Sequence, residues 1–199
     1  MAQQKSGFLS ALGVMWEIWK ALVNAVLDLG GSDDDLRRIQ TDKELRRKLA
    51  ELIVGATRKV FRLVVNYDES VETLVKRGKY DWTNDSITSK NFPTKRTGTS
   101  EVVVELVYLN RAVSTDEALA ELDRMGFRPA ELKELLVLGA EQPELQREFP
   151  IVALGSVWQY PDGDRRCAYL GRYADGRDLD LYWLGRDWYG HCRFAAVRK

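Results

Sequence analysis

The chain has 199 residues, of which 45% are hydrophobic, so it can bury a sizeable core in one large domain, or in one domain with a helical extension. Its 30 lysines and arginines are balanced by 30 aspartates and glutamates, and this zero net charge disfavours a protein whose main partner is a nucleic-acid backbone. Two cysteines are too few for a disulfide framework, and one histidine cannot build a histidine-rich metal site.

Residues 8–29 form a strongly apolar segment that predicts an amphipathic helix ending at Gly30-Gly31. Its polar positions recur at helical spacing, namely Glu17, Lys20, Asn24 and Asp28. The charges of Glu17 and Lys20 interrupt the apolar run, so we do not expect a membrane span. Three roles stay open for this helix: packing on its own domain or on a second subunit, association with a membrane surface, and a targeting signal.

A second helical stretch begins at Asp33-Asp34-Asp35, and Thr41 with Glu44 then has the spacing of a capping box. The apolar face expected to follow consists of Leu45, Leu49, Leu52, Ile53 and Ala56. Further along, we predict a strand over 59–66, a helix over 68–77 capped by Asp68, and a loop over 80–100. A second strand is predicted over 101–109. Two helices, over 115–125 and from Pro129 to Gly139, and a helical turn over 143–149 are predicted to follow.

The chain after Pro150 is predicted to consist of short strands joined by Asp/Gly turns at 162–164 and 175–177. The expected strands cover 151–158, 167–170, 179–184 and 193–197. Helices and strands are largely segregated along the chain, which indicates an α+β fold rather than a doubly wound sheet. We therefore predict an N-terminal helical region over residues 1–58 and an α+β domain over residues 59–199.

The last fifty residues are rich in Tyr, Trp and Arg, the residue types that contribute most to binding at protein surfaces. We predict a binding face there, with candidate ligand-binding residues Tyr182, Arg186, Asp187, Trp188, Tyr189 and His191. Strand alternation places Leu179, Leu181 and Trp183 on one face and Asp178, Asp180 and Tyr182 on the other. The alternative is that these aromatic residues fill a small β core.

The sequence was also searched for a disulfide bond, a metal site and catalytic carboxylates. Cys167 and Cys192 either form one bridge or stay reduced, and spacing alone leaves both open. Asp178 and Asp180 share one side of a strand, so they are either a weak calcium site or solvated edge residues. Such acid pairs also suit glycoside hydrolysis, but nothing sets them apart from the other carboxylates. We therefore predict no catalytic residues, no metal and no cofactor.

The segment Gly126-Phe127-Arg128-Pro129-Ala130-Glu131-Leu132-Lys133-Glu134-Leu135-Leu136 resembles the Gly-x-Arg-Leu-Pro-Thr-x-x-Glu-Trp helix start of the C-type-lectin-like fold. The similarity is to the branch shared with formylglycine-generating enzymes. The segment Arg193-Phe194-Ala195-Ala196-Val197-Arg198 is similar to the final phrase of that branch. The Leu before Pro is missing, Ala130 replaces Thr, and Leu135 stands in place of Trp. The resemblance implies a C-type-lectin-like C-terminal domain without the copper-binding cysteines of those enzymes.

Within this fold, the C-terminal segment resembles the variable proteins of diversity-generating retroelements, which carry a hypervariable patch near the C-terminus. Residues 59–199 also resemble a family of uncharacterised bacterial proteins. The first resemblance implies that Leu179, Leu181, Phe194 and Val197 form a fixed framework. The six candidate binding residues, apart from Trp188, would then lie with Gly185, Gly190 and Cys192 in a patch that varies.

We therefore expect a cytoplasmic, non-enzymatic binding protein whose ligand is a macromolecule, in the first place another protein. Nucleic acid is a less favoured partner because the chain lacks a basic surplus. The alternative is a structural or assembly protein that oligomerises through the helix over residues 8–29, with Trp16, Trp19 and Leu22 as anchors.

Overall fold

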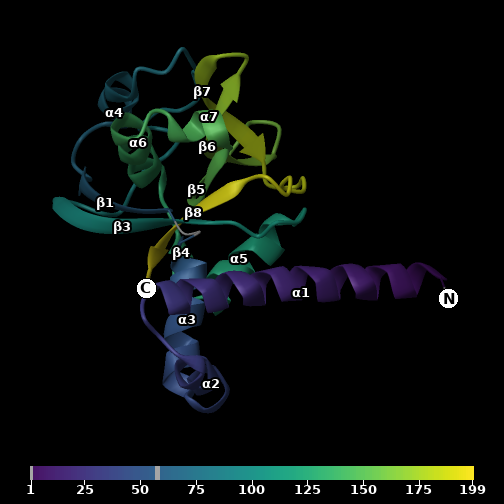
Figure 1. Ribbon diagram of the computed structural model, residues 1–199. Coiled ribbons are helices and arrows are strands. Elements are labelled where there is room, and N and C mark those ends of the chain that lie inside the picture. Colours follow the sequence, from purple (N-terminus) through teal and green to yellow (C-terminus); the bar gives the residue numbers. More distant parts are fainter. Residues whose placement is uncertain (1, 57–58) are drawn as a thin grey trace. The chain divides into compact units, whose positions relative to one another are not determined.

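The computed structural model describes residues 2–56 and 59–199 (Figure 1). These residues form two compact units, residues 1–57 and residues 58–199. The sequence placed the boundary one residue later, at 58. Side chains are described for residues 13–50 and 59–199, so the predicted apolar positions Leu52, Ile53 and Ala56 lie outside the described residues.

The first unit contains three helices, α1 (Ala2–Asp28), α2 (Asp33–Thr41) and α3 (Lys43–Ala56). Gly30 follows α1 with φ of 78°, a left-handed conformation that suits glycine at a helix end. The predicted capping box at Thr41 is wrong, because Thr41 is the last residue of α2. Asp42 caps α3 instead, since its Oδ1 accepts a hydrogen bond of 2.9 Å from the backbone N–H of Leu45.

The described part of α1 exposes large apolar side chains. Met15, Trp16 and Ile18 are 65%, 61% and 64% exposed, and Trp19 is 43% exposed. Glu17 and Lys20 lie within the same stretch, 3.7 Å apart. No helix in the described parts of the chain has the length and apolar character that crossing a membrane requires.

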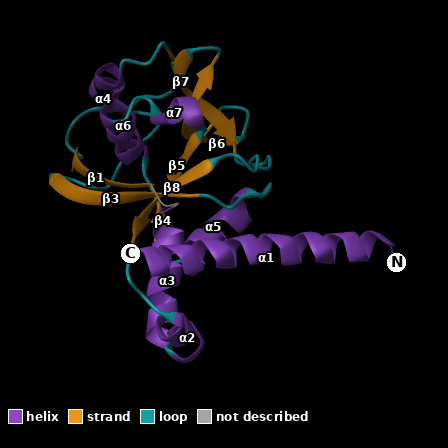
Figure 2. Cartoon of the chain, viewed as in Figure 1, coloured by secondary structure: helices purple, strands orange, loops and turns teal. Residues whose placement is uncertain are grey.

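The second unit is built on one mixed sheet in the order β1-β3-β8-β5-β6-β7-β2, with β4 paired to β8 (Figure 2). Its strands are β1 (Lys59–Asn66), β2 (Trp82–Thr83), β3 (Thr99–Val107), β4 (Phe127–Pro129), β5 (Ile151–Gln159), β6 (Arg165–Tyr173), β7 (Gly176–Trp183) and β8 (Arg193–Arg198). Its helices are α4 (Val71–Gly78), α5 (Thr115–Arg124), α6 (Leu132–Glu141) and α7 (Leu145–Glu148). Helices with a mixed sheet confirm the α+β class.

Each face of the sheet covers its own hydrophobic core, because successive side chains of a strand point to opposite faces. In β8, Ala195 and Val197 join the core that contains α6, whereas Phe194 and Ala196 join the core beneath α5. In β3, Val102, Val104 and Leu106 are buried and the alternate positions Val103 and Val107 are half-buried, as expected of a strand covered on both faces.

Helix α4 begins later than predicted. Ser70, not Asp68, is its N-cap, and the Ser70 hydroxyl accepts a hydrogen bond of 3.1 Å from the Thr73 N–H. Asp68 instead accepts hydrogen bonds from the backbone N–H of Gly98, which ties the loop before β3 to the start of α4. The predicted loop over 80–100 also contains β2, which is too short for any periodicity to reveal.

Pro129 does not start a helix, contrary to the prediction. It ends β4, which pairs with β8, and α6 begins at Leu132 and continues past Gly139. The next residue, Ala130, explains a glycine in β5: the Gly155 N–H donates to the Ala130 carbonyl, and a Cβ on Gly155 would lie 2.5 Å from that oxygen. Glycine thus lets β5 pass close to the start of α6.

Candidate ligand-binding pocket

The loop between β7 and β8 (residues 184–192) carries most of the predicted binding residues and is fixed to the segment at the start of α5. Trp188 and Val113 exchange two backbone hydrogen bonds of 2.8 and 3.2 Å. The Trp188 indole Nε1 donates to the Thr115 hydroxyl (3.0 Å), and that hydroxyl donates to the Leu184 carbonyl (2.8 Å). The loop is therefore held at both its beginning and its middle.

Trp188 is 3% exposed, so the prediction that it points outward is wrong. Its ring packs at 5.0 Å from Tyr182 and 6.1 Å from Phe194, measured between ring centroids. Burial is favoured here because an indole buries a large apolar area once its single N–H has a partner, and Thr115 supplies that partner. For Trp188, the alternative of a small aromatic core is the correct one.

One wall of the pocket comes from the strand pair β6–β7. The register pairs Cys167 with Tyr182 and Tyr169 with Asp180, so all four side chains lie on the same face of the sheet. The Tyr169 and Tyr182 rings are 6.3 Å apart and meet at 85°. This face also carries Asp178, as the sequence alternation predicted.

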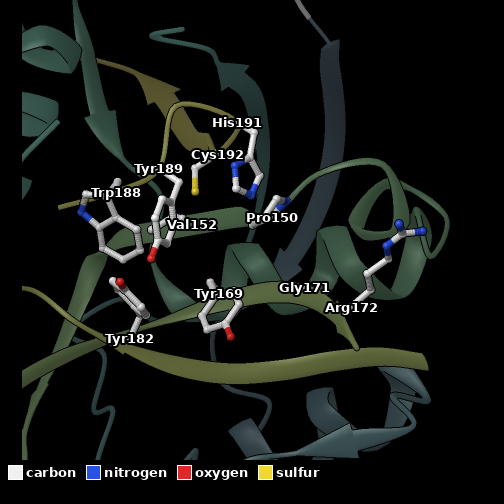
Figure 3. A pocket seen from close by; sticks show the side chains of 10 residues that line it. All are labelled: Pro150, Val152, Tyr169, Gly171, Arg172, Tyr182, Trp188, Tyr189, His191 and Cys192. Carbon is white, nitrogen blue, oxygen red and sulfur yellow. The ribbon is translucent and has the colours of Figure 1, made fainter. Parts of the chain in front are cut away.

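The opposite wall comes from the loop. Tyr189 is 64% exposed, and its ring stacks on His191 with centroids 5.9 Å apart and an interplanar angle of 20°. Figure 3 shows Trp188 and Tyr189 on one side of the pocket and Tyr182 and Tyr169 facing them. Two elements that are consecutive in sequence, β7 and its following loop, thus contribute to both walls.

The cavity between these walls has a volume of about 220 Å³. It is lined by Pro150, Val152, Tyr169, Gly171, Arg172, Tyr182, Trp188, Tyr189, His191 and Cys192. Four of the six predicted site residues are among them, namely Tyr182, Trp188, Tyr189 and His191. An engineered apolar cavity of about 150 Å³ can hold benzene, so this pocket is large enough for a small organic group.

The remaining two predicted residues lie outside the pocket lining. Arg186 is exposed, and its guanidinium carbon lies 4.9 Å from the centroid of the Trp183 ring. Arg166 stacks on the same ring at 4.7 Å and on Tyr160 at 3.8 Å. Asp187 is exposed on the same loop. Arg186 and Asp187 are therefore surface residues beside the pocket rather than part of it.

Carboxylates behind Tyr169 set the electrostatics of the pocket floor. The Tyr169 hydroxyl donates to Asp180 Oδ2 at 3.4 Å, and burial together with Asp180 raises the pKa of Tyr169 to about 12. Burial and the neighbouring carboxylates of Asp180 and Asp81 raise the pKa of Asp178. Asp180 Oδ1 also accepts from Asn84 Nδ2 (2.8 Å). The carboxylates of Asp180 and Asp178 thus lie near the Tyr169 hydroxyl at the pocket floor.

The cysteines are both reduced and buried, which answers the question that spacing left open. Burial raises the pKa of the Cys167 thiol and of the Cys192 thiol, so neither is an activated nucleophile. Cys192 contributes to the pocket wall as a small apolar side chain.

Tyr169 and Arg172 are the lining residues with functional groups that the sequence did not single out. Tyr169 lies in the predicted strand over 167–170, two residues from Cys167, so alternation alone placed it on the face of Cys167. What was missing was the pairing of β6 with β7, which brings this tyrosine beside Tyr182. Arg172 lies beyond the predicted end of that strand, at a position where no pattern indicated a site.

In the described parts of the chain, no group of three or more His, Cys, Asp and Glu side chains is arranged to hold a metal ion. Among the described residues, Asp178 and Asp180 therefore belong to no such group. Comparison of the chain with protein-family models, with curated proteins and with solved structures finds no match.

Proposed function

We propose that this protein is a non-enzymatic binding protein and that the aromatic pocket between β6, β7 and the 184–192 loop is its ligand site. The observation that carries the proposal is the cavity itself, which gathers Tyr182, Trp188, Tyr189 and His191 around one space. A concave, mostly aromatic site with a few polar groups is typical of ligand pockets. Arg186 and Asp187 extend the contact surface beyond the cavity.

The ligand that fits this surface best is another protein. Tyr189 and His191 are exposed at the pocket edge, and Arg186 lies on the neighbouring surface, stacked on Trp183. Rigid aromatic anchors around a pocket, surrounded by charged side chains, are the arrangement found at binding hot spots. Because the loop is fixed by Thr115 and Val113, little conformational entropy is lost when a partner binds.

We further propose that residues 59–199 adopt a C-type-lectin-like fold and that the protein functions as a retroelement variable protein does. The short strand β4, the helix α6 and the final strand β8 occupy the segments that carry the resemblance. Exposed Gly185, Arg186, Asp187, Tyr189 and His191 suit positions that vary, whereas buried Leu179, Leu181, Phe194 and Val197 suit a fixed framework. A neighbouring reverse-transcriptase gene and an imperfect repeat of the 3′ coding end would be expected.

The test is affinity capture with matched variants. Tyr189→Ala and His191→Ala remove exposed side chains of the pocket edge, so the protein should stay folded while partner binding falls at least tenfold, since hot-spot truncations cost roughly 2 kcal/mol or more. Tyr173→Ala removes a tyrosine that is 82% exposed and lies outside the pocket lining. If a partner binds wild type and the Tyr189 variant equally well, the pocket is not its site.

A second candidate function, assembly through α1, is favoured by the exposed apolar side chains of that helix. Trp16, Ile18 and Trp19 are unusually exposed for residues of their type. Light scattering after size exclusion would compare the full chain with Trp16→Glu and with a chain lacking residues 1–31. Fewer subunits per particle in both variants than in the full chain would support assembly, whereas a monomer in all three proteins would exclude it.

A further inference from the structure

We propose that the pocket binds a compact quaternary ammonium group, through cation–π contacts with its aromatic walls. This inference rests on the proposed function, because it names the chemistry that the same pocket would recognise. The group could be carried by a methylated lysine of a protein partner or by a small choline-like molecule. The shared chemistry is a trimethylammonium cation, and the experiment below separates the two sources.

The ring geometry favours a rounded cation over a flat ligand. Tyr169 and Tyr182 meet at 85°, and Tyr182 and Trp188 meet at 46°, so the rings form the corner of a box. Because these rings are inclined to one another, they form no shared flat platform on which a planar base or aromatic ring would stack. Boxes of tyrosine and tryptophan faces are the arrangement that suits methylated ammonium groups.

The charges near the pocket also favour a cation. Asp180 accepts a hydrogen bond from the Tyr169 hydroxyl at 3.4 Å, and this contact makes the ring of Tyr169 richer in electron density. Burial, together with the like charges of Asp180 and Asp81, disfavours ionisation of Asp178 and raises its pKa. A cation over Tyr169 would relieve this repulsion, whereas an anion would increase it.

Arg172 is the one charged side chain in the pocket lining, and it does not oppose this assignment. It is exposed, and Figure 3 shows its guanidinium at the end of the pocket away from Trp188 and turned from the rings. Charges that face solvent are strongly screened at physiological ionic strength. A cation at the other end of the pocket, beside Tyr182 and Tyr189, would therefore lie among aromatic rings and away from this guanidinium.

The test compares choline with 3,3-dimethylbutan-1-ol, which has the same shape but no charge, by calorimetric titration of the full chain. We expect choline to bind about tenfold more tightly or better, because a desolvated cation–π contact contributes at least that much. Tyr189→Leu should weaken choline binding about tenfold, and Tyr189→Trp should preserve it. The control Tyr173→Leu should leave it within about twofold, because Tyr173 lies outside the pocket lining.

Equal binding of the uncharged alcohol, or no binding of choline at millimolar concentrations, would overturn the inference. A loss with Tyr173→Leu as large as with Tyr189→Leu would also overturn it. These failures differ from failure of the proposed function, which is judged by partner capture with the Tyr189 and His191 variants. If a partner is captured and choline does not compete with its binding, the proposed binding function stands and only the proposal of an ammonium ligand is overturned.

Two further titrations identify the source of the cation. A peptide with one trimethyl-lysine is compared with the same peptide carrying unmodified lysine, and both are compared with free choline. Tighter binding of the trimethyl-lysine peptide than of choline assigns the pocket to a modified protein. Binding of choline alone assigns it to a small molecule. Tight binding of the unmodified peptide at the pocket would contradict the requirement for a methylated cation.

Discussion

Glu134 is a fully buried carboxylate that joins several segments near the start of α6. Its oxygens accept hydrogen bonds from both Nη atoms of Arg128 (2.7 and 3.0 Å), from the Tyr67 hydroxyl (2.6 Å) and from the Glu131 N–H (2.7 Å). A buried charge is tolerated only when it is paired and hydrogen-bonded, and Glu134 meets both conditions. In the sequence, Glu134 is only one residue of the lectin-like segment 126–136. Its hydrogen bonds to other segments are visible only in the structure.

Glu134→Ala should lower the free energy of unfolding by about 3–5 kcal/mol, because it leaves Arg128 partly buried without its carboxylate. Urea denaturation followed by circular dichroism measures the change. Glu141→Ala, at an exposed position of the same helix, serves as the control and should change stability by less than about 0.5 kcal/mol. A similar small effect of both variants would mean that the buried network contributes little.

The same network predicts a dependence of stability on pH. Burial opposes ionisation of Glu134, but the Arg128, Tyr67 and Glu131 donors outweigh it and hold the pKa of Glu134 below its usual value. The stabilisation is therefore complete above the unfolded-state pKa of about 4.3 and is lost as pH falls through the lower folded-state value. The stability difference between wild type and Glu134→Gln should shrink below about pH 5, and a difference that grows with acid would contradict this.

Glu72 offers a test at the surface. The Ser89 hydroxyl (2.7 Å) and the Ser89 backbone N–H (2.8 Å) donate to its carboxylate, and they lower the pKa of Glu72 to about 2. Ser89→Ala removes the hydroxyl, so the pKa should rise toward about 4.3. A carboxyl NMR titration measures it. Lys90→Ala, an exposed neighbour, should leave the pKa unchanged, and an equal shift in both variants would contradict the hydrogen-bond explanation.

At the scale of elements, the strands over 59–66 and 101–109 were predicted because both segments are rich in β-branched and apolar residues, and the structure has strands at Lys59–Asn66 and Thr99–Val107. The Pro129 helix was wrong because proline suits the first turn of a helix and the end of a strand equally well. The pairing of β4 with β8 makes Pro129 the end of a strand, and no local sequence pattern indicates this long-range pairing.

The candidate site was predictable to a similar extent. Residue type identified Tyr182, Tyr189 and His191, and strand alternation oriented Tyr182 correctly. Trp188 was assigned the wrong environment because its partner, Thr115, lies on another element far away in sequence. The packing that closes the pocket thus depends on contacts that a single sequence does not contain.

The anchoring of the 184–192 loop to α5 predicts the effect of Thr115→Val. The change keeps the shape but leaves the Trp188 indole N–H and the Leu184 carbonyl without a buried partner, at a cost of about 1–3 kcal/mol. Hydrogen exchange should accelerate at the backbone amides of residues 184–192. Thr97→Val at an exposed position is the matched control, and equal exchange in the loop of both variants would show that the anchor is not needed.

At the scale of the whole molecule, the division into two units predicts that residues 59–199 fold alone. Every described residue of the two hydrophobic cores of the sheet belongs to this unit, so the chain without residues 1–57 keeps all of these core residues. The shortened chain should keep dispersed NMR amide signals and the wild-type affinity for choline or for a captured partner. Loss of the folded spectrum on shortening would show that the first unit is needed for folding.

Strand β8 lies in the middle of the sheet, between β3 and β5, although it is the last strand in the sequence. The strand pair β1–β3 and the strands β5, β6, β7 and β2 are therefore joined within the sheet only through the hydrogen bonds of β8, residues 193–198. During synthesis, β1, β3, β5, β6 and β7 emerge from the ribosome before the strand that connects them. Assembly of this sheet is consequently delayed until the β8 residues have left the exit tunnel, and until then the unpaired edges of β3 and β5 are exposed to chaperones and to other nascent chains.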